Sequence, residues 1–220
     1  MFSDFYPTPY KCLEHTKDII QRSRIMLEGT AGLGSITAWA SDYISPKQII
    51  ANELSPKLST ILKELQPNIK VMTENFITKK YDTWNKDIDT IYLNPPFTNQ
   101  GDKKFYIDFL FQAIAILNHN KGNSQRLHNL VFISPRLTDK IKQTQKENQV
   151  IVMDYIVDKI PLKKLQSVVK NITGEQVKSK EEFIETLQDD LFYTTQIQFI
   201  ATCEGFGGTK IRADIYNFII

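Results

Sequence analysis

Seven short apolar runs, separated by helix-like segments, divide this sequence and restrict its fold more than any other feature. The runs are 25–27, 49–54, 69–72, 88–93, 130–134, 196–203 and 210–220. Alternation of such runs with helices is typical of a mainly parallel sheet. Right-handed crossovers would place the helices on both faces of that sheet. We therefore predict an α/β fold.

The last two runs are separated differently, because only residues 204–209, which include three glycines, lie between them. A connection of this length suits a β-hairpin and not a helical crossover. We predict a C-terminal antiparallel hairpin within a single domain spanning residues 1–220, as the length allows. Residues 136–194 are expected to hold a small substrate-recognition insertion, in which 150–157 fit a strand or a buried helix equally well.

Helix starts are predicted at two pairs of a hydroxyl residue and a proline, Thr8–Pro9 and Ser55–Pro56. In such pairs the hydroxyl caps the helix and the proline occupies the first turn. The second of these helices would bury 58, 61, 62 and 65 on one face. A further helix is expected over residues 103–118.

The charge balance is nearly even, with 27 Lys and Arg against 25 Asp and Glu and a net charge of +2. This balance neither requires nor excludes a nucleic-acid partner. Cys12 and Cys203 lie far apart in the sequence without a CxxC or a histidine pair, which argues against a disulfide framework or a zinc site. No run reaches the roughly 18 apolar residues of a membrane span. We expect a soluble cytoplasmic protein that binds no metal.

Asn94, Pro95, Pro96 and Phe97 directly follow one predicted strand, at the end where open α/β sheets bind ligands. Two consecutive prolines donate no backbone hydrogen bond and stiffen the turn, so its carbonyl oxygens face a fixed direction. The Asn94 side-chain oxygen and the Pro95 carbonyl could each accept one hydrogen of an exocyclic amine. These hydrogen bonds would free the lone pair of the amine for attack on a methyl group. Phe97 would stack on the substrate ring. The alternative is that the prolines only end the strand and Phe97 packs in the core.

A glycine-rich turn over residues 28–34 follows the first predicted strand. Gly29, Gly32 and Gly34 lack the G-x-G-x-x-G spacing that binds a pyrophosphate, and no P-loop lysine follows. Glu28 would repel phosphates but suits a cationic ligand such as a sulfonium. Glu53, about twenty residues further on, can accept both hydroxyls of a ribose. The alternatives are a plain tight turn and a solvated strand-end acid.

These residues together resemble those of class I S-adenosylmethionine-dependent methyltransferases, in the amino-methyltransferase branch marked by Asn, Asp or Ser before two prolines and an aromatic residue. The resemblance implies a Rossmann-like, seven-stranded, mainly parallel sheet closed by an antiparallel hairpin. Residues 5–9 are similar to the F-x-T-P element of DNA N6-adenine methyltransferases. That likeness implies that Tyr6, Thr8 and Pro9 help to hold the methionine end of the cofactor.

The resemblance also assigns the remaining contacts with S-adenosylmethionine. They are Glu28, Gly29, Thr30, Gly32 and Gly34 at the methionine moiety, Glu53 at the ribose, and Leu54, Asn75 and Phe76 at the adenine. Glu28 and Gly29 stand where the family often has Asp and Pro, and Asn75 stands where it often has an acidic residue.

The favoured interpretation is an N6-adenine methyltransferase that acts on DNA after flipping the target adenine out of the duplex. Lys103, Lys104, Arg126 and Arg136 would track phosphates beside the site, and a partner subunit would assist target recognition. Three alternatives stay open. They are the same chemistry on adenine in RNA or on a protein glutamine, a non-catalytic subunit with this fold, and a nicotinamide-dependent enzyme.

Overall fold

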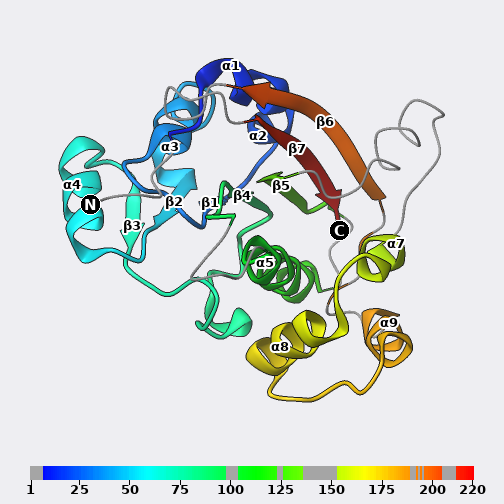
Figure 1. Cartoon of the computed structure of the whole chain (residues 1–220). Coiled ribbons are helices and arrows are strands. Elements are labelled where there is room, and N and C mark those ends of the chain that lie inside the picture. The colour runs from blue at the N-terminus through cyan, green and yellow to red at the C-terminus, as the bar shows by residue number, and fades with distance from the viewer. Residues whose placement is uncertain are drawn as a thin grey trace.

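The computed structural model describes residues 7–97, 104–122, 126–135, 153–188, 192, 194, 196–204 and 212–220. Its described strands form one sheet in the order β3-β2-β1-β4-β5-β7-β6 (Figure 1). They are β1 Met26–Glu28, β2 Ile49–Asn52, β3 Lys70–Met72, β4 Thr90–Leu93, β5 Asn129–Ser134, β6 Gln196–Glu204 and β7 Arg212–Ile219. Strands β1 to β5 are parallel, whereas β7 runs antiparallel to both β5 and β6. The predicted Rossmann-like sheet with a C-terminal antiparallel hairpin is confirmed, although residues 205–211 of the hairpin connection lie outside the described part.

Helices lie between the parallel strands along the chain. Their bounds, with the short 3-10 helices marked η, are α1 Tyr10–Leu13, η1 Glu14–Thr16, α2 Lys17–Gln21, α3 Ser35–Ala40, η2 Pro46–Gln48, α4 Pro56–Leu65, η3 Tyr81–Thr83, α5 Tyr106–Lys121, α7 Met153–Asp158, α8 Leu162–Thr173 and α9 Lys180–Gln188. No described helix is long and apolar enough to cross a membrane.

Successive residues of the central strands enter two different cores, because strand side chains alternate between the faces of a sheet. On β4, Ile91 and Leu93 pack with α5, α8 and α9, whereas Tyr92 packs with α1, α2 and α3. Both faces of the sheet are therefore covered by helices, as predicted. Burial of every residue of β1, β2 and β4 explains why these strands appear in the sequence as continuous apolar runs.

The first helix start differs from the prediction. Helix α1 begins after Pro9 and has no side-chain cap, because the Thr8 hydroxyl contacts Asn94 instead. Ser55 does cap α4, accepting the Leu58 amide at 3.4 Å. The predicted apolar face of α4 is only partly correct, since Leu65 is 63% exposed.

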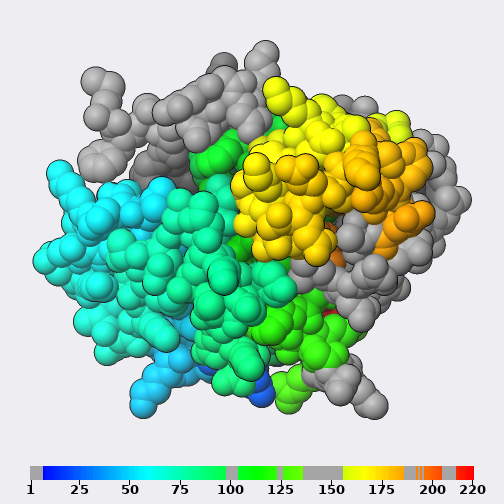
Figure 2. Space-filling view, turned by 90° about the horizontal axis from the view of Figure 1, so that it is seen from below, coloured from blue at the N-terminus to red at the C-terminus, as the bar shows by residue number. Residues whose placement is uncertain are grey.

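Helices α7 to α9 pack on the outer side of α5, in the same core as the sheet (Figure 1). Phe111 of α5 contacts Phe183 and Phe192 edge-on, with ring centroids 5.4 Å apart in both pairs. Lys164 of α8 forms an ion pair with Asp108 of α5, and these side chains are only 12% and 6% exposed. Figure 2 shows α8 and α9 beside the segment that joins β3 to β4. A substrate-recognition role for 136–194 stays a prediction, and 136–152 lie outside the described residues.

The two cysteines are distant in the sequence but neighbours in the fold. Cys12 of α1 and Cys203 of β6 belong to one core cluster, are 1% and 4% exposed, and are free thiols. Burial and the adjacent Cys12 thiol raise the pKa of Cys203. The Cys203 thiol therefore stays protonated at neutral pH, and both buried cysteines pack as small apolar groups.

Candidate functional site at the carboxyl edge of the sheet

The glycine-rich turn and the Asn94 turn lie beside each other, because β1 and β4 are neighbouring parallel strands. Glu28 is paired with Tyr92 in their register, and the Gly29 amide donates a hydrogen bond to the Tyr92 carbonyl at 3.2 Å. Asn94 follows β4 by one residue, so both turns start from the same edge of the sheet. Ligands of open α/β sheets bind at this edge.

The glycines of the turn serve distinct structural needs. Gly32 and Gly34 have φ values of +54° and +80°, a left-handed conformation that favours glycine. At Gly29 the constraint is space, because an added Cβ would lie 2.5 Å from Leu93 Cδ2 and 2.7 Å from Phe76 Cε2. The turn is therefore packed directly against the end of β4. Ligand contact at these glycines stays a prediction.

Glu53 fixes the position of the glycine-rich turn. One carboxylate oxygen accepts the Gly32 amide and the other accepts the Ser55 amide, both at 2.8 Å. Glu53 is only partly buried, and a carboxylate offers about four acceptor positions. Its carboxylate can therefore hold the turn and still accept hydrogen bonds from the hydroxyl groups of a ligand.

Asn52 joins the turns that follow three strands, and the sequence analysis did not identify it. Its side chain is 1% exposed and donates to the carbonyls of Gly29 at 3.2 Å and Glu74 at 3.1 Å. Its oxygen accepts the Glu74 amide at 3.1 Å. The signal available in the sequence was a carboxamide at the end of an otherwise apolar run, directly before Glu53.

Glu28 lies beneath the turn and not on its surface. It is 1% exposed and accepts the amide of Thr37, in the first turn of α3, at 3.1 Å. Burial raises the pKa of Glu28 well above its ordinary range, although the Thr37 hydrogen bond opposes this shift. Its structural role is to cap α3, and contact with a cationic ligand stays a prediction.

The three residues expected at a bound adenine occupy different environments. Leu54 is 63% exposed and presents an apolar surface beside Glu53. The Asn75 side-chain oxygen accepts the amides of Ile77 and Thr78 at 3.1 and 3.3 Å, which directs the amide nitrogen elsewhere. Phe76 is 3% exposed and stacks on Phe109 at 5.8 Å, so it supports the turn from within the core.

The Asn94 turn is tied to the N-terminal segment. The Asn94 amide nitrogen donates to the Thr8 hydroxyl at 3.0 Å, and the Thr8 backbone amide donates to the Ser35 hydroxyl at 3.2 Å. Pro95 is buried, whereas Phe97 is partly buried and contacts Tyr106 edge-on with centroids 6.4 Å apart. Part of the Phe97 side chain therefore remains accessible beside Asn94.

The predicted basic track is placed only in part. Lys104 precedes α5 and donates to the Lys159 carbonyl at 3.1 Å. Arg126 was wrongly placed by the sequence analysis, since it precedes β5 and so lies at the amino end of the sheet, away from Asn94. Tyr6, Lys103 and Arg136 lie outside the described residues.

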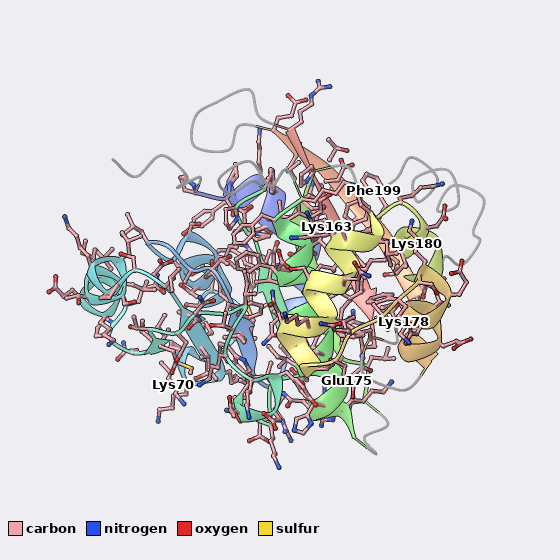
Figure 3. All side chains as sticks on the ribbon, turned by 60° about the horizontal axis from the view of Figure 1, so that its bottom comes forward. Lys70, Lys163, Glu175, Lys178, Lys180 and Phe199 are labelled. Carbon is pink, nitrogen blue, oxygen red and sulfur yellow. The ribbon has the colours of Figure 1, made fainter. Side chains whose placement is uncertain are left out.

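Helices α7 to α9 do not add a strongly basic surface. Residues 153–188 contain six lysines and six Asp or Glu residues, for a net charge of zero. Figure 3 shows Lys163, Lys178 and Lys180 on the α8–α9 side of the molecule and Lys70 on the opposite side. These four lysines therefore do not form one continuous basic track.

A pocket of about 360 Å³ also adjoins the glycine-rich turn. It is lined by Pro7, Leu33, Gly34, Ser35, Ala38, Leu65 and Gln66. Glu53, Leu54 and Asn94 are absent from this lining, so the pocket lies apart from the edge where the two turns meet.

No family model and no curated protein matches this sequence. Many solved structures match this chain, and three of them serve here as examples. A Pyrococcus horikoshii protein described as an RNA methyltransferase is 16% identical, with 97% of this chain and 85% of that chain covered and a TM-score of 0.51. A dimethyladenosine transferase from Plasmodium falciparum is 13% identical, with 98% and 62% covered and a TM-score of 0.54.

The third structure, the 23S rRNA methyltransferase ErmE, is 12% identical, with 97% of this chain and 68% of that chain covered and a TM-score of 0.51. This chain has the class I methyltransferase fold. At identities this low the likeness establishes the fold alone. The chain spans about three fifths of the Plasmodium enzyme and about two thirds of ErmE. The activity of a methyltransferase fold must be argued from its site.

Proposed function

We propose that this chain transfers a methyl group from S-adenosylmethionine to the exocyclic amino group of adenine in a nucleic acid. One observation carries the proposal: the Gly29 amide bonds to the Tyr92 carbonyl, so the glycine-rich turn and the Asn94 turn share one sheet edge. A methyl donor on the first turn would then lie beside an amine acceptor on the second. Reaction by methyl transfer requires this proximity.

The side chains at this edge fit S-adenosylmethionine. Glu53 has acceptor capacity for ribose hydroxyls, and exposed Leu54 offers an apolar face for the adenine. The Thr30 hydroxyl is buried without a hydrogen-bond partner among the described residues, and buried polar groups are rarely left so. A carboxylate at the methionine end would satisfy it. When bound, S-adenosylmethionine supplies an electrophilic methyl group on a sulfonium.

The Asn94 turn supplies the groups that act on the amine. The Asn94 side-chain oxygen and the Pro95 carbonyl each accept one hydrogen of the amino group. These two hydrogen bonds draw its lone pair out of conjugation with the ring and orient it for in-line attack. Phe97 stacks on the base, a contact that contributes about 1 to 3 kcal/mol. Attack would form the N–C bond as the methyl–sulfur bond breaks, and the methylated nitrogen would then lose its extra proton to solvent. This chemistry needs no acid–base pair among the protein residues.

Adenine in DNA is the first substrate that we propose, because residues 5–9 are similar in sequence to the F-x-T-P element of DNA N6-adenine methyltransferases. Flipping the adenine out of the duplex would cost a few kcal/mol before transfer. Adenine in RNA is the second candidate. It is favoured by the three similar structures named above, two of which are described as RNA methyltransferases and one as a dimethyladenosine transferase.

The decisive test is incubation with methyl-labelled S-adenosylmethionine and a matched panel of DNA, RNA and protein, followed by nucleoside and amino-acid analysis. We expect label in N6-methyladenosine derivatives, at least 100-fold less in Asn94→Ala, by analogy with the loss of one preorganised hydrogen-bonding group (about 10² to 10³). Label in RNA alone would select the second substrate. Label on glutamine, or cofactor binding without any transfer, would refute the proposal.

A further inference from the structure

Thr8 is positioned between the two halves of the site. It is 4% exposed, and its hydroxyl accepts the Asn94 amide nitrogen at 3.0 Å. Its backbone amide donates to the hydroxyl of Ser35 at 3.2 Å. Ser35 is the first residue of α3 and directly follows Gly34, the last glycine of the turn. A continuous chain of hydrogen bonds therefore runs from the end of the glycine-rich turn, through Thr8, to Asn94.

The orientation of the Asn94 carboxamide matters for the proposed chemistry. A carboxamide has an acceptor end and a donor end, and only the acceptor end can bind the hydrogens of an amine. If the donor end faced the substrate, two sets of N–H groups would oppose each other. The contact between Thr8 and the Asn94 nitrogen directs the donor end toward the N-terminal segment. The oxygen is directed away from Thr8 as a consequence.

We propose that Thr8 is a positioning residue, whose hydroxyl holds the Asn94 carboxamide with its oxygen toward the substrate amine; this rests on the proposed function. The role differs from the cofactor contact that the sequence resemblance implied for Thr8. A buried hydroxyl bonded to Asn94 acts on the acceptor side of the reaction. Thr8 therefore affects the rate of transfer and not the affinity for S-adenosylmethionine.

Two substitutions separate the hydroxyl from the shape of the side chain. Thr8→Val keeps the branched shape and removes the hydroxyl, and Thr8→Ser keeps the hydroxyl and removes the methyl group. We expect kcat to fall about tenfold in Thr8→Val, as for the loss of one hydrogen bond, and to remain within about threefold of wild type in Thr8→Ser. The dissociation constant for S-adenosylmethionine, measured by calorimetry, should change less than about threefold in both.

A second readout does not depend on activity. The side-chain amide of Asn94, assigned by comparison with Asn94→Ala in ¹⁵N-correlated NMR spectra, should exchange with solvent faster in Thr8→Val and as slowly as wild type in Thr8→Ser. If Thr8→Val does not fold, as judged by circular dichroism, Thr8→Ala replaces it in both measurements. Unchanged amide exchange on loss of the hydroxyl would refute the positioning role.

The two measurements also distinguish this proposal from the proposed function. If the wild-type protein transfers methyl groups and Thr8→Val has the same kcat, the positioning role is refuted and the proposed function is not affected. If Thr8→Val has a higher dissociation constant for S-adenosylmethionine but an unchanged kcat, Thr8 is a cofactor contact and the positioning role is also refuted. Wild-type protein inactive on every substrate would refute the function, and with it the positioning role for catalysis, whatever the amide exchange.

Discussion

Gly29→Ala tests whether close packing between the glycine-rich turn and β4 determines the geometry of the site. The added Cβ would lie 2.5 Å from Leu93 Cδ2, and 2.7 and 2.9 Å from two atoms of the Phe76 ring. Leu93 is fully buried, and Phe76 is 3% exposed with its ring stacked on Phe109, so neither side chain has open space to enter. Overpacking of this kind costs about 1 to 3 kcal/mol.

For a chain of this length, 1 kcal/mol corresponds to about 2 to 4 °C in melting temperature, so a loss of 2 kcal/mol lowers it by about 4 to 8 °C. Thermal denaturation followed by circular dichroism measures this directly. The double variant Gly29→Ala with Leu93→Val should be less destabilised than the sum of the two single changes, because the smaller side chain makes room for the methyl group.

Gly174→Ala is a matched control at the C-terminal cap of α8. Gly174 has a φ of +82° and nothing within 4 Å of an added Cβ, so the substitution introduces backbone strain without a clash. It should cost about 1 to 2 kcal/mol and add independently to Leu93→Val. A melting temperature of Gly29→Ala equal to that of wild type, or strict additivity with Leu93→Val, would refute the packing argument.

Three further predictions follow from buried groups. Burial raises the pKa of Glu28 above its usual 4.5, so the folded state retains a proton that the unfolded state releases. The free energy of unfolding should therefore fall as pH rises from 4.5 toward the raised pKa, and Glu28→Gln should remove this pH dependence in urea denaturation at several pH values. Stability profiles of wild type and Glu28→Gln that run parallel with pH would contradict this prediction. Lys164→Met should cost about 3 kcal/mol by removing the ion pair between Lys164 and the buried Asp108 carboxylate, and adding Asp108→Leu should recover most of this loss. Equal stability of the single and double variants would contradict this prediction. The buried thiols of Cys12 and Cys203 should react with an aromatic disulfide reagent promptly in denaturant but, in the folded protein, only as fast as the structure opens locally. Immediate reaction under native conditions would contradict their burial.

The sheet could be predicted from sequence because its strands are buried on both faces. Residues 88–93 were predicted as a strand and form β4 Thr90–Leu93, and the three-glycine connection after 203 predicted the antiparallel pair β6 and β7. The helix starting at Thr8 was less predictable, since propensity alone assigns a hydroxyl residue before a proline to capping. In the structure the Thr8 hydroxyl contacts Asn94 and does not cap the helix.

The site could be predicted as a set of turns but not as a set of contacts. Glu53 and Asn94 were identified because each polar residue ends an apolar run at the ligand-binding edge. Asn52, which links the turns after β1, β2 and β3, depends on strand order and register, which one sequence does not specify. The packing of Phe76 against Gly29 could not be predicted for the same reason, and the resemblance assigned Phe76 only to the adenine of the cofactor.

The most direct test of the central claim is a crystal structure with bound S-adenosylhomocysteine, the product that remains after methyl transfer. We predict that its ribose contacts the Glu53 carboxylate, its adenine lies against Leu54, and its sulfur lies between the glycine-rich turn and Asn94. Binding in the pocket lined by Leu33 and Leu65, or no binding at millimolar concentration, would contradict the assignment of this sheet edge as a methyl-transfer site.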